Sequence, residues 1–447
     1  MNILLDQEVC RVKISANIKK KLSNPSEFMS HKTIPVTLGL FLTIATSAYS
    51  KDVISEASLY TVKFTTAVDY PFGNDRKGTS RGSGFLVDKE RGWILTNAHV
   101  ASRSPSHLRV SFKDQPYTAA QKVYVDNHLD LAVIKVDPSK IPASAVAANL
   151  FCGQEPAPGL PVIAFGHPWN LDYTATRGII SGTKSLSEVE QLQTDAALNP
   201  GNSGGPLIDE KTGDVVGVNA SGMSKSDGLN FAVPIKLVCT ILDLLKDGKN
   251  PSPPILPLSF GTTLRERELL VASVKDEWAQ SLKIGDRIVA VNGDRTARYA
   301  SRVLDHMRGK DSARVTVVRD GKEQEIALAV PQNRDDVKRL GVHFSGMTIS
   351  KSTLTGFDPT VMFIHFIDDA SIAEQAQFRE GDRIISIDGM ETTSHDDVLK
   401  ALKGKEGKDL EFIFKRPRSN SGVTFDHMAR KVEIGPITIL DEKGLRN

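Results

Sequence analysis

Short apolar runs separated by turn residues dominate residues 55–235 of this chain. The runs include GSGFLVD, LRVSF, LAVIKV and PVIAFG, with glycine, proline, asparagine and aspartate between them. Strands of this length and spacing are typical of an all-β barrel or sandwich. Residues 235–247 instead carry apolar side chains at helical spacing, which predicts a helix that closes the first domain. The proline-rich stretch 251–257 follows and is suited to a stiff linker.

A repeated pattern follows the linker. The segment GDRIVAVNG at residues 285–293 returns as GDRIISIDG at residues 381–389. In each copy a stretch able to form a helix comes next, and then β-rich sequence. Such a repeat predicts two homologous small domains. We place them at residues 258–332 and 338–437, after a first domain at residues 51–250.

The first fifty residues have the pattern of an export leader. Residues 34–48 are uncharged and mostly apolar, but the run is shorter than the roughly 20 residues that a membrane-spanning helix needs. A basic residue precedes the run and a small-residue cleavage site ending at Ser50 follows, as in a secretory signal peptide. The alternative is an uncleaved membrane anchor. Because Met29 opens the signal cleanly, we expect translation to begin there, with residues 1–28 upstream of the natural start.

The charge balance changes once the leader is set aside. The chain has 56 Lys plus Arg and 54 Asp plus Glu, a formal net charge of +2. The leader holds six of the basic residues and three of the acidic ones, so the rest of the chain carries −1. A basic surface for nucleic acid is therefore not indicated, and phosphate-loop and dinucleotide fingerprints do not occur. We expect export, to the periplasm, and no stable membrane span.

Three cysteines limit the redox and metal chemistry. Cys10 lies in the leader, which leaves Cys152 and Cys239 in the exported chain. The two could form one disulfide in an oxidising compartment or remain as buried thiols, and the sequence leaves both open. The spacing of a structural zinc site, such as C-x-x-C, does not occur. We expect no metal and no cofactor.

Residues 201–206 (GNSGGP) are the strongest candidate for a catalytic turn. A nucleophilic serine needs an exposed tight turn that aims backbone N–H groups at the developing oxyanion, and glycines permit such a backbone. The natural donors would be the N–H groups of Gly201 and Ser203. Taken alone, the segment could also be an ordinary glycine-rich turn.

Two further residues have the context of catalytic partners. A serine hydroxyl is a weak nucleophile until a base accepts its proton and an acid orients that base. His99 lies in the apolar run ILTNAHV, and Asp130 opens the run DLAVI. Asp126 and His128 are nearby competitors, but the apolar run after Asp130 makes it the better buried orienting acid.

The motifs TNAHV, DLAV and GNSGGP, in this order, resemble those of the trypsin/chymotrypsin fold. With a signal peptide before them and a repeat that resembles paired PDZ domains after them, the chain resembles the HtrA/Deg family of serine proteases over residues 55–437. The resemblance implies a mainly β protein: a chymotrypsin-like double β-barrel protease domain followed by two PDZ domains, which are small α/β barrels. It also implies that Ser203 is the nucleophile, His99 the general base and then acid, and Asp130 the orienting residue.

The resemblance also bears on activation. Trypsin-type zymogens mature when a new N-terminal ammonium pairs with an aspartate just before the serine. Asn202 stands at that position and carries no charge, so activation by proteolysis is not indicated. Residues 193–197 resemble the family's adjustable loop, which leaves ligand binding and assembly as the switches.

For the substrate, the resemblance implies a binding strand and a pocket. A bound peptide backbone would pair with the strand edge formed by Ala220, Ser221 and Gly222. The specificity pocket would be walled by Gly228, Leu229 and Asn230. No acidic residue appears in these segments except Asp227, so a pocket for Lys or Arg is not indicated. We expect cleavage after small or medium aliphatic residues in unfolded chains.

PDZ domains capture a C-terminal carboxylate with backbone N–H groups of a glycine-containing loop, while the peptide adds a strand. In the second copy, Leu340, Gly341 and Val342 match the family's carboxylate loop. In the first copy, Phe260 and Gly261 take the equivalent place as a looser match. Peptide binding is therefore more clearly indicated for the second copy, and a structural role is the alternative for both.

Two functions fit the sequence. The first is an exported serine endopeptidase that degrades misfolded or unfolded proteins, with PDZ domains that bind C-terminal peptides for substrate capture or activation. The second is a protein-binding chaperone or scaffold with little proteolysis, which would not need all three catalytic side chains. The resemblance implies a homotrimer or a multiple of trimers, and the candidate contact residues are Tyr60, Phe64, Tyr70 and Phe72.

Overall fold

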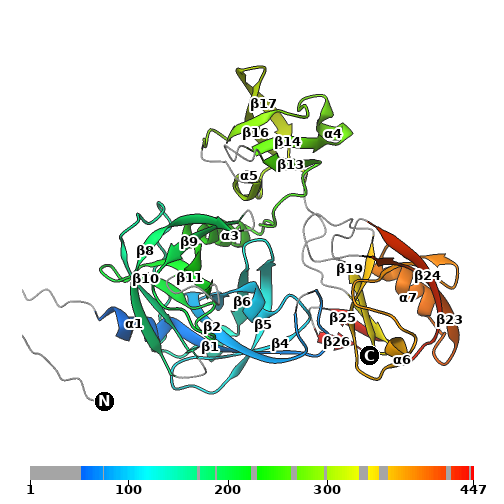
Figure 1. Cartoon of the computed structure of the whole chain (residues 1–447). Coiled ribbons are helices and arrows are strands. Elements are labelled where there is room, and N and C mark those ends of the chain that lie inside the picture. Colours follow the sequence, from blue (N-terminus) through cyan, green and yellow to red (C-terminus); the bar gives the residue numbers. More distant parts are fainter. Residues whose placement is uncertain are drawn as a thin grey trace, which may run out of the picture. The chain divides into compact units, whose positions relative to one another are not determined.

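The computed structural model describes residues 52–73, 75–168, 172–186, 189–222, 229–262, 269–295, 300–331, 341–351, 361–418, 424–441 and 444–446. The leader, Gly228 and Leu340 lie outside the described residues. Two closed β-barrels come first along the chain, and two further sheets follow (Figure 1). No helix in the described ranges is long and apolar enough to cross a bilayer.

The first barrel closes in the strand order β1-β2-β3-β6-β5-β4. Its strands are β1 (Thr61–Val68), β2 (Gly78–Asp88), β3 (Trp93–Thr96), β4 (His107–Ser111), β5 (Thr118–Asp126) and β6 (Leu131–Val136). Helix α2 (Ala98–Ala101) follows β3 directly. Helix α1 (Val53–Tyr60) precedes the barrel, where the alternating pattern predicted β-structure, and the Asp52 carboxylate caps it by accepting two backbone N–H groups.

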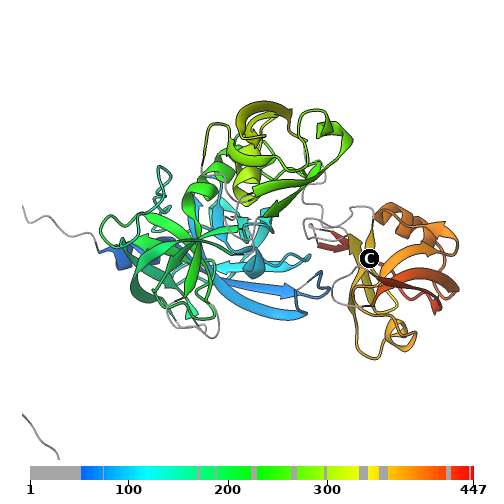
Figure 2. The ribbon, with the colours of Figure 1, turned by 45° about the horizontal axis from the view of Figure 1, so that its top comes forward.

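The second barrel closes in the order β10-β11-β12-β9-β8-β7. Its strands are β7 (Pro161–Gly166), β8 (Thr174–Leu186), β9 (Val189–Thr194), β10 (Pro206–Asp209), β11 (Val215–Gly222) and β12 (Asn230–Pro234). A short 3-10 helix, η1 (Pro138–Lys140), lies in the connection from the first barrel. Phe85 and Leu95 of the first barrel belong to one buried core with Phe165 and Val218 of the second, and the two barrels lie side by side in Figures 1 and 2.

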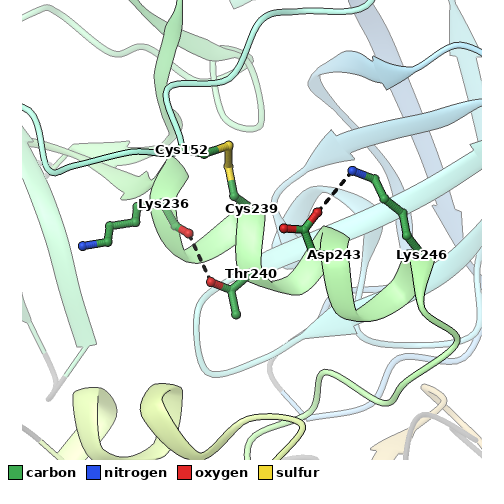
Figure 3. The surroundings of a disulfide bond; sticks show 6 residues. All are labelled: Cys152, Lys236, Cys239, Thr240, Asp243 and Lys246. Carbon is green, nitrogen blue, oxygen red and sulfur yellow. Dashed lines mark hydrogen bonds and ion pairs between the residues drawn. A yellow bond between two sulfur atoms is a disulfide. The ribbon is translucent and has the colours of Figure 1, made fainter. Parts of the chain in front are cut away.

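Helix α3 (Ile235–Lys246) confirms the helix predicted after the barrels. Ile235, Val238 and Ile241 lie on its buried face, in the same core as the barrels. A disulfide joins Cys239 on this helix to Cys152 in the connection before β7 (Figure 3). The structure therefore favours the disulfide over the two free thiols that the sequence left open.

The first repeat unit is a five-stranded sheet in the order β13-β14-β15-β16-β17. Its strands are β13 (Leu258–Thr262), β14 (Leu269–Val274), β15 (Arg287–Val291), β16 (Ser312–Arg319) and β17 (Lys322–Ala329). Its helices are α4 (Asp276–Ala279) and α5 (Ala300–Met307). The unit has its own buried core, which includes Val271, Leu282 and Val303.

The second repeat unit is a nine-stranded sheet in the order β24-β23-β21-β20-β19-β18-β25-β26, with β22 paired to β21. Its strands are β18 (Gly341–Phe344), β19 (Met347–Lys351), β20 (Met362–Ile367), β21 (Arg383–Ile387), β22 (Met390–Glu391), β23 (Asp409–Pro417), β24 (Phe425–Glu433), β25 (Thr438–Asp441) and β26 (Gly444–Arg446). Its helices are α6 (Ile372–Gln375) and α7 (His395–Leu402). The boundary expected at residue 437 is too early, because β25 pairs with β18 inside this unit. The repeat pattern did not predict residues 438–446 as part of the unit, because the described strands of the first unit include no counterpart to them.

Candidate active site

The pairing of β3 with β6 brings His99 and Asp130 together. Thr96 lies opposite Ala132, so the residues just after β3 and just before β6 are neighbours. His99 Nδ1 lies 2.7 Å from Asp130 Oδ2, and the backbone N–H of His99 donates to Asp130 Oδ1 at 3.0 Å. One carboxylate thus fixes both the backbone and the ring of the histidine. The other ring nitrogen, Nε2, is left to exchange a proton with a nucleophile.

Asp130 is held in a backbone conformation that few residues adopt. Its φ of +55° lies in the left-handed region, which aspartate tolerates better than most side chains. The Asn97 amide donates to the Asp130 carbonyl at 3.0 Å. Arg103 Nη2 donates to Asp130 Oδ1 at 3.2 Å and places a positive charge beside the carboxylate. These contacts give the acid a single orientation toward His99.

The turn that carries Ser203 packs directly on the first barrel. Gly201 and Gly204 have φ values of +108° and +83°, which favour glycine. A Cβ on Gly204 would lie 2.2 Å from the carbonyl oxygen of Ser83 and from Thr96 Oγ1. The N–H of Ser83 in turn donates to the Ser203 carbonyl at 2.9 Å. This close approach ties the turn to β2 and to the end of β3, which leads into His99.

The Ser203 hydroxyl donates to the carbonyl of Ala220 at 2.5 Å. It makes no hydrogen bond to His99 among the described residues, so its proton acceptor in this structure is a backbone oxygen. The N–H groups of Gly201 and Ser203 have no hydrogen-bond acceptor within the described part of the chain. Both donors are therefore available to a substrate carbonyl oxygen.

The competitor Asp126 has a different role. Its buried carboxylate accepts the backbone N–H groups of His128 and Leu129, at 2.9 Å each, and so caps the turn that follows β5. Arg308 Nη1 also donates to it at 2.7 Å. Because these donors occupy the Asp126 carboxylate, His99 is oriented by the other acid of this segment.

The residues expected to bind substrate lie at the ends of β11 and β12. Gly222 lies opposite Asn230 and Ser221 opposite Phe231, so the end of β11 runs beside the start of β12. Asn230 is buried and its amide donates to the carbonyl of Ala196 at 3.0 Å. The structure thus brings one strand edge together with the residues expected to wall the pocket, and the described members of this set are Ala220, Ser221, Gly222, Leu229 and Asn230.

Residues 193–197, which precede the turn, are tied to β8. The Thr194 hydroxyl donates to the carbonyl of Ile179 at 2.8 Å. The Asp195 carboxylate accepts the backbone N–H of Ile179 at 2.7 Å. The Thr176 hydroxyl of the same strand donates to the Ala197 carbonyl at 2.7 Å. The segment that leads to Ser203 is therefore held at several points along β8, and movement of either segment would move the other.

Sequence reasoning missed Ser83 and Arg103. The Ser83 hydroxyl donates to the carbonyl of Gly201 at 2.7 Å and accepts the N–H of His167 at 2.9 Å, which braces the catalytic turn. The run GSGF could have found Ser83, because glycines inside a strand mark close approach of another backbone. Arg103 carries no comparable signal, since its position depends on the path of the chain after α2.

The repeat units place the expected carboxylate loops differently from the sequence prediction. Phe260 and Gly261 lie inside β13, paired with Val271 and Leu270, and do not form a loop. Gly341 and Val342 likewise lie inside β18, paired with β19, while Leu340 falls outside the described residues. At these four described positions the predicted loop is wrong, because glycine between apolar residues occurs in strands as well as in carboxylate loops.

Strand pairing identifies the equivalent positions of the two units. Leu258 lies opposite Val274, Met347 lies opposite Ile367, and both strands have an irregularity after their second residue. β13 and β19 are therefore equivalent. The loop before each of them ends at Pro257 in the first unit and at Gly346 in the second, and each of these carbonyls accepts a matching backbone N–H, at 2.8 and 2.7 Å.

Three of the four aromatic residues expected at subunit contacts are buried within the chain itself. Tyr60 and Phe64 are 2% and 1% exposed in the core of the barrels, and Phe72 is fully buried. A buried ring is not free to contact another subunit. Only Tyr70 of this set keeps partial exposure, and its ring lies 4.3 Å from that of His343.

Two family models match the chain. Residues 82–218 match the trypsin-like peptidase domain, which includes His99, Asp130 and Ser203. Residues 367–416 match the PDZ domain and lie in the second repeat unit.

Relatives match over longer stretches. A probable periplasmic serine endoprotease, DegP-like, from Marinomonas sp. is 31% identical over 379 residues, which are 74% of this chain and 77% of the relative. The chloroplastic Protease Do-like 1 of Arabidopsis thaliana is 34% identical over 57% of this chain and 64% of its own length. Among solved structures, the HtrA-type protease AlgW with tripeptide has a TM-score of 0.51 and 28% identity, over 62% of this chain and 95% of that one.

Proposed function

Since this chain belongs to the HtrA/Deg family of serine endoproteases, we propose that it cleaves peptide bonds through Ser203, His99 and Asp130. The observation that carries the assignment is the double contact of one carboxylate with the backbone and ring of His99. That contact gives the ring the one orientation in which Nε2 can serve as a base. A scaffold without catalysis has no need of it.

The proposed reaction is acyl transfer in two stages. Ser203 Oγ attacks the scissile carbonyl while His99 Nε2 takes its proton, and the resulting imidazolium faces the Asp130 carboxylate. The N–H groups of Gly201 and Ser203 hold the developing oxyanion. His99 then protonates the leaving amine, which separates, and water, deprotonated by the same ring, hydrolyses the acyl-enzyme. Before the first stage the Ser203 hydroxyl must turn from the Ala220 carbonyl toward His99.

The proposed substrates are unfolded polypeptides that add an extended segment to the end of β11. Ala220, Ser221 and Gly222 offer the strand edge, and the pocket beside Asn230 would take a small or medium aliphatic side chain. Support comes from Asn230, whose amide is engaged with the Ala196 carbonyl, and from Leu229, since neither of these two described residues of the pocket offers a carboxylate to a Lys or Arg substrate. Cleavage confined to sites after Lys or Arg in a peptide library would refute this preference.

We propose further that the protein is exported and that both repeat units are PDZ domains. The disulfide between Cys152 and Cys239 supports an oxidising compartment. The register that β13 shares with β19 supports a common ancestry of the two units. Export to the periplasm with cleavage near Ser50, and assembly into trimers or multiples of trimers, belong to the same proposal.

Casein digestion by the wild type and by Ser203→Ala tests the function. We expect the substitution to lower the rate by at least about 10⁴-fold, because no other group on the turn can form the acyl-enzyme. Suppression of aggregation of an unfolded client, measured on the same two preparations, reports the alternative chaperone activity. Equal proteolysis by both proteins would eliminate the assignment of Ser203.

A further inference from the structure

The two repeat units differ at the strand where a peptide would add. In the first unit, β13 is the last strand of the sheet among the described strands, so its outer edge has no strand beside it. In the second unit the equivalent strand, β19, is followed in the sheet by β18, β25 and β26. The edge that is open in one unit is covered in the other by the chain's own residues.

The covering strand β18 lies as a bound C-terminal peptide would. It runs antiparallel to β19, with Val342 opposite Ile349 and Phe344 opposite Met347. Its last residue, Phe344, joins the loop before β19, which is where the carboxylate of an added peptide would bind. The direction of β18 and the position of its C-terminal end are therefore those expected of a bound peptide, although β18 is part of the domain itself.

The side chains of β18 also occupy the places of a ligand's anchors. Phe344 is fully buried, with its ring stacked 6.0 Å from that of Phe412, and Val342 is 1% exposed. Both belong to the core that includes Ala401 and Leu402 of α7, the helix that β18 lies against. Alternate residues of a strand face the same way, so these two fill the space between the sheet and α7.

A tight turn and a further strand hold β18 in place. Ser345 and Gly346 have φ values of +51° and +81°, as a two-residue hairpin requires, and a Cβ on Gly346 would lie 2.1 Å from Ser371. The outer edge of β18 pairs with β25, where Gly341 lies opposite Leu440. A free peptide would have to displace a strand that is tethered by two residues and paired on both edges.

We propose that strand β18 occupies the peptide-binding edge of β19, so that the second unit captures no C-terminal peptide. Peptides would then bind at the edge of β13 in the first unit. This rests on the proposed role of the units in peptide capture. It reverses the order that the sequence indicated, in which the second unit was the better candidate.

Hydrogen exchange of the full chain carrying Ser203→Ala tests the proposal. Without peptide, we expect fast exchange at residues 258–262 and slow exchange at residues 341–351. Within the two repeat units, a pool of ten-residue peptides with free carboxylates should slow exchange at residues 255–262 and not at residues 341–351. The amidated pool should change exchange at neither segment. Protection gained at residues 347–351, with protection lost at residues 436–446, would overturn the proposal.

Two exposed isoleucines give matched variants. Ile255 lies in the loop before β13 and is 62% exposed, and Ile439 lies on β25 and is 37% exposed, so an aspartate at either should leave the fold intact. Ile255→Asp should weaken binding of the pool by at least about tenfold, because its charge repels the peptide carboxylate, and Ile439→Asp should not change it. The reverse result would contradict the proposal. If no peptide binds anywhere, peptide capture fails, while exchange of the free protein still decides whether β19 is covered.

Discussion

At the scale of residues, the site depends on a few backbone groups as much as on the catalytic side chains. Asp130 reaches His99 only from a left-handed backbone conformation, which Asn97 holds by a hydrogen bond to its carbonyl. Ser203 lies where it does because Gly204 lets the turn approach the Ser83 carbonyl. Strained backbone of this kind persists where the surroundings over-determine it, and here it sets the geometry of a proton transfer.

Asn202, the neighbour of the nucleophile, allows a direct test of its environment. It is fully buried, and neither Oδ1 nor Nδ2 has a hydrogen-bond partner among the described residues. Asn202→Asp would bury an unpaired carboxylate and should lower the free energy of unfolding at pH 7 by about 3 kcal/mol or more. Asn202→Leu, which has a similar volume, should stay within about 1 kcal/mol of wild type. Urea denaturation measures both, and an Asp variant as stable as wild type would mean that a cation reaches this position.

His167 predicts how stability depends on pH. Burial lowers the pKa of its imidazole from the ordinary 6.5 to about 4, so the folded protein keeps the ring neutral. Below pH 6.5 the His167 imidazole binds a proton in the unfolded chain but stays neutral in the folded chain. The free energy of unfolding therefore falls as the pH drops toward 4. Between pH 7.5 and pH 5, this group alone should lower the free energy of unfolding by about 2 kcal/mol.

His167→Phe checks that contribution. Its urea midpoint should fall less than that of the wild type over the same range of pH. His343, whose pKa is also lowered to about 4 by burial, remains in both proteins and contributes equally to each. Parallel pH profiles of the two proteins would contradict the prediction.

At the scale of elements, the sequence predicted which segments form helices and strands better than it predicted which strands pair. The alternation of apolar runs predicted the barrels, and helical spacing predicted α3, because each pattern reflects one buried face. The catalytic motifs stood out because their residues have few other reasons to occur together. Pairing is different: Gly341-Val342 reads the same in a loop as in β18, and only the register with β19 and β25 separates the two. The contact between Arg103 and Asp130 could not be predicted for a similar reason, since it depends on the path of the turn after α2.

The disulfide is the element-scale constraint with a measurable effect. It links Cys152 to Cys239, 87 residues apart, and so ties the connection before the second barrel to α3 (Figure 3). Closing so long a loop restricts the unfolded chain, and removing the link should cost about 2–4 kcal/mol. Thermal unfolding of the double variant Cys152→Ala, Cys239→Ala should show a lower Tm than the wild type. Two titratable thiols in the denatured, unreduced protein without residues 1–50 would contradict the link.

At the scale of the whole molecule, each catalytic part comes from a different segment. In the proposed function the first barrel supplies His99 and Asp130, and the second supplies Ser203 and the strand edge for the substrate. Among the described strands, β13 is the last of its sheet, whereas the equivalent β19 is covered by β18. The slight positive charge of the full chain belongs to residues 1–50, and the remainder is close to neutral. Attraction to polyanions is therefore not expected, and the proposed ligands are extended polypeptides bound by strand addition.

Labelling with a fluorophosphonate reports directly whether His99 activates Ser203, because the reagent bonds only to a serine that a base activates. Wild type, incubated with the probe and the free-carboxylate peptide pool, should carry one label, and mass spectrometry should place it on Ser203. Ser203→Ala and His99→Ala should remain unlabelled. A label on another residue, or a wild type that stays unlabelled while it digests casein, would contradict the account.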